Sequence, residues 1–150
     1  MNAGKATSHR IELEAKQIIN QYIQWFANYT YTWTTLKNGV DPDQDRSNLS
    51  FVPNYVINAG LTLNLPKDIF CSPYLHAVGM YYDSTSNSGR LKFGPYQTVN
   101  VNLRKAFITG PHQSFNLTVD LNNLTNQKYE MPWQFQNTGF TMFVGVEARF

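Results

Sequence analysis

Charge is scarce in this sequence of 150 residues: Asp, Glu, Lys and Arg together make up 15% of it, and the formal net charge is +2. Because the lysines and arginines form no cluster, nucleic acid is not expected as a partner. Long apolar runs are missing too. No stretch of about 18 apolar residues exists, which excludes a transmembrane helix.

Thiols and metal ligands are equally few. Cys71 is the only cysteine, so no internal disulfide can form. His9, His76 and His112 fall on different predicted strands and turns, and no other ligand type lies at a suitable spacing. We therefore expect neither a metal site nor a bound cofactor. The first ten residues also lack the apolar core of a secretory signal, which suggests a piece of a longer chain or a different natural start.

What the sequence does contain is aromatic residues, at 15%, and alternation of period two. The stretch Gly139–Phe150 is the clearest example. Its even-numbered residues are all apolar: Phe140, Met142, Val144, Val146, Ala148 and Phe150. Its odd-numbered residues include Thr141, Glu147 and Arg149. This pattern predicts a transmembrane β-strand, which needs about 9–11 residues with apolar side chains toward lipid.

The same pattern recurs along the chain. Residues 22–35 alternate over a length well beyond the soluble average of about 5–6 residues, with aromatics concentrated toward both ends. In all we predict seven strands and no helix, near residues 9–17, 22–35, 51–64, 73–83, 96–107, 115–122 and 139–150. For residues 73–83 the alternation fits either face toward lipid.

The predicted connections alternate in length. Polar loops at 36–50, 84–95 and 123–138 follow the second, fourth and sixth strands, and short turns follow the others. Outer-membrane barrels show this asymmetry, with long loops outside and short turns in the periplasm. The fold class is therefore all-β, an antiparallel meander of about seven long strands that is part of a transmembrane outer-membrane β-barrel.

The strand charges are expected to point into the barrel, because a lysine or arginine facing lipid costs roughly 2–4 kcal/mol at mid-bilayer. This set comprises Glu12, Glu14, Lys16, Arg104, Asp120, Glu147 and Arg149. Glu12 and Glu14 lie about 7 Å apart on one strand face, with no nucleophile or sugar platform nearby. We expect no catalytic residues and no enzyme.

Several segments together resemble a known family. They are Ser8–Ala15, Ala27–Thr32, Phe51–Tyr55, Val99–Phe107, Val119–Tyr129 and the terminal Phe150. In this order they resemble the carboxy-terminal part of TonB-dependent outer-membrane receptors, over nearly the whole chain. One departure is Asn137-Thr138-Gly139-Phe140, where the family often has Pro-Gly-Arg before the last strand.

The resemblance implies that residues 1–150 are a carboxy-terminal barrel segment, without the plug domain and the earlier strands of a barrel of about 22 strands. It implies a receptor in the outer membrane of a Gram-negative bacterium that takes up a scarce nutrient, most often a ferric siderophore or cobalamin. The plug domain, TonB and such a ligand would be its partners in the full receptor. The chain alone is not expected to transport.

The resemblance also suggests a role for Phe150 as the terminal residue read by the barrel-assembly machinery. Tyr129, Trp133 and Phe135, in the last outside loop, are candidates for an extracellular ligand site; packing within the loop is the alternative. An odd strand number would leave edges unpaired in membrane lipid, so further strands are expected. Two other readings are a small self-contained outer-membrane barrel with a structural or adhesion role, and a soluble ligand-binding barrel such as a lipocalin.

Overall fold

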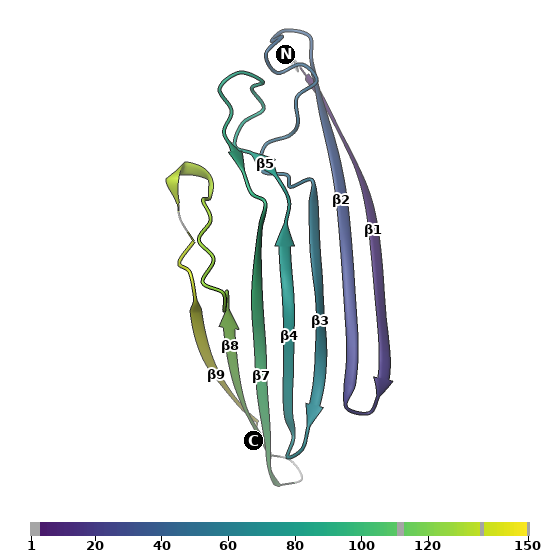
Figure 1. Ribbon diagram of the computed structural model, residues 1–150, viewed down its shortest axis with the longest axis vertical. Helices are drawn as coiled ribbons and strands as arrows, with labels where there is room; N and C mark the ends of the chain where they lie inside the picture. Colours follow the sequence, from purple (N-terminus) through teal and green to yellow (C-terminus); the bar gives the residue numbers. More distant parts are fainter. Residues whose placement is uncertain (1–3, 111–112, 136, 150) are drawn as a thin grey trace.

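The computed structural model describes residues 4–110, 113–135 and 137–149, which form an antiparallel sheet topped by loops (Figure 1). Seven strands pair in the order β1-β2-β3-β4-β7-β8-β9. They are β1 (Gly4–Asn20), β2 (Ile23–Asn38), β3 (Tyr55–Leu65), β4 (Ile69–Val78), β7 (Tyr96–Gly110), β8 (Gln113–Asn122) and β9 (Thr141–Arg149). The predicted all-β meander is confirmed.

The other elements lie in the connections. The strands β5 (Tyr81–Tyr82) and β6 (Lys92–Phe93) form a separate two-stranded sheet. A single 3-10 turn, η1 (Pro132–Gln134), follows β8. No helix among the described residues is long and apolar enough to cross a membrane.

Several predicted boundaries are wrong. The first strand runs from Gly4 to Asn20 rather than over 9–17. The third strand begins at Tyr55 rather than at residue 51. The backbone N–H groups of Phe51 and Asn54 donate to the carbonyls of Tyr82 and Met80, so this segment bonds to the second loop. The fourth strand runs from Ile69 to Val78 rather than over 73–83. The stretch 84–95, predicted as loop throughout, contains β6, which pairs with Tyr81 and Tyr82.

Strand register assigns every strand residue to one of two faces, because residues paired across an antiparallel ladder point the same way. The apolar face carries rows such as Leu13–Tyr29–Ile57–Ala77. In β9, Met142, Val144 and Val146 lie on this face opposite Leu121, Val119 and Leu117. This agrees with the lipid-facing set predicted for the terminal strand.

The opposite face is polar and tied by hydrogen bonds. Asn58 donates from Nδ2 to Asn28 Oδ1 at 2.8 Å, and its Oδ1 lies 2.6 Å from His76 Nδ1. Next to them, Thr98 and Asn100 are 7% and 5% exposed. All seven strand charges predicted to point inward lie on this face by register: Glu12, Glu14, Lys16, Arg104, Asp120, Glu147 and Arg149.

The register also settles which face of the fourth strand is apolar. Leu75 pairs with Ala59 and Val99, whereas His76 pairs with Asn58 and Thr98. Leu75 and Ala77 therefore belong to the apolar face. Within the central strand β7, Val99 on the apolar face is 36% exposed, whereas Thr98 and Asn100 on the polar face are 7% and 5% exposed. A soluble barrel would show the reverse distribution.

Candidate functional site

Three long connections leave the sheet at the same end, and the tight turns lie at the other (Figure 1). We call them the first loop (residues 39–54), the second loop (79–95) and the third loop (123–140). Long and short connections alternate along the antiparallel strands, so the three long ones lie at one end of the sheet, as predicted from the sequence. The candidate site is built from these loops.

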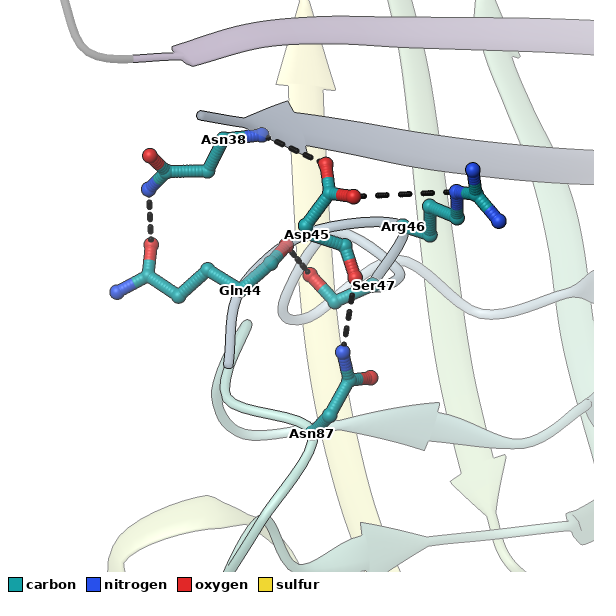
Figure 2. Close-up of polar contacts among 6 residues, drawn as sticks. All are labelled: Asn38, Gln44, Asp45, Arg46, Ser47 and Asn87. Carbon is teal, nitrogen blue, oxygen red and sulfur yellow. Dashed lines mark hydrogen bonds and ion pairs between the residues drawn. The ribbon is translucent and has the colours of Figure 1, made fainter. Parts of the chain in front are cut away.

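The first loop is ordered by its own short polar side chains (Figure 2). Asp45 accepts a hydrogen bond from the backbone N–H of Asn38 at 3.1 Å, and Asn38 donates from Nδ2 to Gln44 Oε1 at 3.3 Å. Ser47, only 1% exposed, donates to the Gln44 carbonyl at 2.8 Å. These bonds replace strand pairing where the chain turns away from the sheet.

The first loop is clamped to the second through Asp43. The Asp43 carboxylate accepts hydrogen bonds from the Ser86 hydroxyl and, at 2.9 Å, from the Ser88 backbone N–H. The Asn87 N–H donates to the Asp43 carbonyl at 2.8 Å, and its side chain donates to the Asp45 carbonyl at 3.0 Å (Figure 2). The hydrogen bond from Ser86, followed by those from Ser88, holds the pKa of Asp43 below its ordinary value of 3.8.

The second loop has a small apolar core. Tyr81 and Phe93 stack at 5.7 Å and bury themselves with Val78. The Arg90 guanidinium lies 3.9 Å from the centre of the Tyr82 ring, a cation–π contact. Burial, together with the neighbouring Tyr129 phenol, raises the pKa of Tyr81.

The third loop is anchored at its start by Asn123, which is 5% exposed. The backbone N–H of Asn123 donates to Asn100 Oδ1 at 2.9 Å, and its side chain bonds both polar backbone groups of Gln127. Farther on, Tyr129 stacks on Tyr96 with ring centroids 3.8 Å apart and planes 3° apart. The loop is therefore attached to β7 at two points.

A cleft of about 530 Å³ opens between the second and third loops. Its lining is mainly apolar, with three charged side chains. The lining residues are Asp83, Leu91, Lys92, Phe93, Glu130, Met131, Trp133 and Phe135. Trp133 and Phe135 are 76% and 65% exposed, so both side chains leave large aromatic surfaces open to solvent.

Trp133 also reaches the first loop, where its ring lies 5.2 Å from that of Phe51. Both residues have left-handed backbone conformations, with φ of 61° for Trp133 and 59° for Phe51. Bulky side chains rarely adopt this region, and such strain gathers at ligand sites and switch regions. The two aromatics that join the first and third loops are thus held at an energetic cost.

The predicted site residues lie in different surroundings. Trp133 and Phe135 line the cleft, whereas Tyr129 packs on Tyr96. Their role toward a ligand stays a prediction. Phe150, the predicted assembly signal, lies outside the described residues. Sequence reasoning missed three charged cleft residues, Asp83, Lys92 and Glu130. They carry no spacing signal, because they line one cleft only once the β5–β6 hairpin and the third loop are folded.

The histidines are separated as predicted where they are described. His9 lies on the apolar face, stacked on Trp33 at 5.2 Å, whereas His76 lies on the polar face. His112 falls outside the described residues. Within residues 4–110, 113–135 and 137–149, no three His, Cys, Asp or Glu side chains are grouped to hold a metal ion.

An antiparallel sheet with long strands, an exposed apolar face, a polar face opposite and long loops at one end defines a wall segment of an outer-membrane β-barrel. Residues 1–124 match the family model described as TonB-dependent receptor-like, β-barrel. The chain belongs to this family. It is accordingly a protein of the Gram-negative outer membrane, in a family of receptors and transporters rather than enzymes.

Solved structures show the same fold. The chain is similar to the ferric yersiniabactin uptake receptor FyuA from Yersinia pestis, with a TM-score of 0.70 and 23% identity over 99% of this chain and 24% of that receptor. It is also similar to BauA, the ferric preacinetobactin receptor from Acinetobacter baumannii, with a TM-score of 0.81 and 16% identity over 100% of this chain and 23% of that receptor. The chain thus spans about a quarter of either structure. No curated protein matches it significantly.

Proposed function

We propose that this chain is the carboxy-terminal wall segment of a TonB-dependent receptor that takes up a scarce nutrient, a ferric siderophore in the first place and cobalamin in the second. Membership of the family supports the receptor role. Two structural neighbours are named as receptors for ferric yersiniabactin and ferric preacinetobactin, which supports a siderophore as the ligand.

The observation that carries the proposal is the cleft between the second and third loops. It lies at the end of the sheet that carries the long connections, and these are the outside loops in barrels of this kind. Trp133 and Phe135 present flat apolar surface there, which suits the aromatic and heterocyclic rings common in iron chelators. Loop capture of the ligand comes first, and the strands supply the wall.

The remaining partners follow from the same proposal. A plug domain would fill the lumen against the polar face, TonB would drive plug rearrangement, and the barrel-assembly machinery would read the terminal strand. Outer-membrane lipid would cover the apolar face. The chain by itself would not transport, because the energy-coupling parts lie elsewhere. The alternative of a small structural or adhesion barrel has no observation in its favour.

Uptake in iron-starved cells tests the proposal. Cells that carry only this receptor would be given radioactive iron as ferric yersiniabactin or ferric preacinetobactin, or radiolabelled cyanocobalamin. Replacing Trp133 and Phe135 together by alanine should lower uptake of the transported compound about tenfold or more. Aromatic anchors often contribute 2 kcal/mol or more to binding, which corresponds to about a thirtyfold change in affinity.

Val40→Ala is the matched control. Val40 is an exposed apolar residue of the first loop and does not line the cleft, so its replacement should leave uptake unchanged. Unchanged uptake in the Trp133→Ala/Phe135→Ala variant would remove the cleft from the mechanism. Absence of uptake of all three compounds by the unaltered receptor would overturn the choice of ligand class.

A further inference from the structure

The cleft between the second and third loops is lined by more acidic than basic side chains. Asp83 and Lys92 line it from the second loop and Glu130 from the third. Asp83 accepts a hydrogen bond from the Leu91 backbone N–H at 2.9 Å, which orients its carboxylate. None of the three charged side chains takes part in an ion pair within the described parts of the chain. Two acidic groups and one basic group give the lining a net charge of −1, although the whole chain carries +2.

The other basic side chains of these two loops, Arg90 and Lys128, do not line the cleft. The Arg90 guanidinium is held over the Tyr82 ring, 3.9 Å from its centre. In physiological salt, an exposed charge is largely screened beyond about 8 Å. The charges on the lining therefore dominate the electrostatic potential that a ligand in the cleft experiences.

Aromatic surface adjoins the acidic groups. Trp133 and Phe135 follow Glu130 in the third loop, and the Met131 N–H donates to the Phe135 carbonyl at 2.8 Å. This bond closes the turn that carries Trp133, whose ring contacts Phe51 and is otherwise largely open to solvent. The face of a tryptophan ring attracts cations through its quadrupole. Because carboxylates add direct Coulomb attraction, this combination suits an ammonium group.

We propose that the cleft selects ferric chelates that carry an ammonium group and have a net charge of zero or above. The ammonium group binds between the Trp133 ring and the carboxylates of Asp83 and Glu130, and Lys92 donates to an oxygen of the chelate. Triscatecholate chelates of ferric iron, which are trianionic, are repelled by the net negative lining. This inference rests on the proposed function and names the class of ligand within it.

Two forms of one chelate isolate the charge. Ferrioxamine B is a ferric trihydroxamate with a free terminal amine, and its N-acetyl derivative keeps the same iron centre without the ammonium group. Isothermal titration calorimetry of the gene's full product, purified in detergent, would give both affinities. The unaltered protein should bind the amine form at least about fivefold more tightly, since unit charges about 4 Å apart attract one another even in water. Ferric enterobactin, a triscatecholate, should bind more weakly than either.

Variants of the lining should change the ratio of the two affinities. Glu130→Gln and Asp83→Asn should each lower it about fivefold, and Lys92→Gln should raise it about fivefold. Asparagine at position 83 can still accept the hydrogen bond from the Leu91 N–H. Trp133→Leu keeps apolar bulk but removes the ring, so it should lower the ratio about twofold to fivefold.

Asp41→Asn is the matched control. Like Asp83, Asp41 is a half-buried loop carboxylate that accepts a backbone N–H, here from Asp43 at 3.0 Å, but it does not line the cleft. Its replacement should leave the ratio unchanged. If variants of the lining fail to assemble, salt gives the second test on the unaltered protein. At 1 M salt the Debye length shrinks to about 3 Å, so the preference for the amine form should largely disappear.

Three results would overturn the selection by charge: equal affinity of the unaltered protein for the two forms, no binding of either, or an unchanged ratio in both Glu130→Gln and Asp83→Asn. The proposed function would stand in each case if iron-starved cells still took up another ferric siderophore through this receptor. If they took up no ferric chelate at all, both the proposed function and this inference would be wrong.

Discussion

The orientation of β4 gives the sharpest prediction, because its sequence fits either face. Leu75 lies on the apolar face between Ala59 and Val99, and His76 lies on the polar face beside Asn58. Lysine at position 75 would place an ammonium group in lipid, at a cost of about 2–4 kcal/mol near mid-bilayer. This lowers the folding equilibrium constant about thirtyfold to nearly a thousandfold.

Lysine at position 76 should cost much less. Its ammonium would stay on the polar face, and the main loss is the contact between His76 and Asn58 at 2.6 Å, worth about 1 kcal/mol. The measurement is a urea titration of the full gene product refolded into lipid vesicles, followed by the shift in electrophoretic mobility on heating. Leu75→Ala separates the charge from the lost side chain. A larger loss for His76→Lys than for Leu75→Lys would refute the assigned facing.

Three further predictions concern the loops and the chain end. The pKa of Asp43 is depressed, so acidification below the ordinary Asp value of 3.8 should progressively open the clamp between the first and second loops. The stability that a depressed carboxyl pKa contributes is lost as the pH falls through that pKa. Distances between spin labels on the two loops would show the opening, and Asp43→Asn should abolish its pH dependence. Gly79→Ala should loosen the second loop and speed its proteolysis, since the new Cβ would overlap the Asn54 side chain and the Tyr55 ring. Gly39→Ala is the control, because a Cβ at this loop glycine would meet no atom within 4 Å. Deleting Phe150 from the full gene product should lower the amount of assembled barrel, and an undiminished heat-shifted band would refute its role as a signal.

Much of the fold follows from the sequence because each lipid-facing strand must satisfy its backbone with its neighbours and show one apolar face. The alternation in residues 22–35 and 139–150 therefore fixed both the strand type and the facing. The alternation of long and short connections fixed which loops share an end. The family likeness also rested on residues alone, from Ser8–Ala15 to Val119–Tyr129.

Tertiary structure decided what local pattern leaves open. Within β4, apolar or aromatic side chains occur on both faces, so only the pairing of Leu75 with Ala59 and of His76 with Asn58 could assign them. The cleft likewise depends on two loops that are far apart in sequence, since Lys92 lines it from the second loop and Glu130 from the third. The pairing of Lys5 with Lys37 could not be predicted either. A period of two assigns each residue to a face of its own strand, but the register between strands decides which residue lies opposite it.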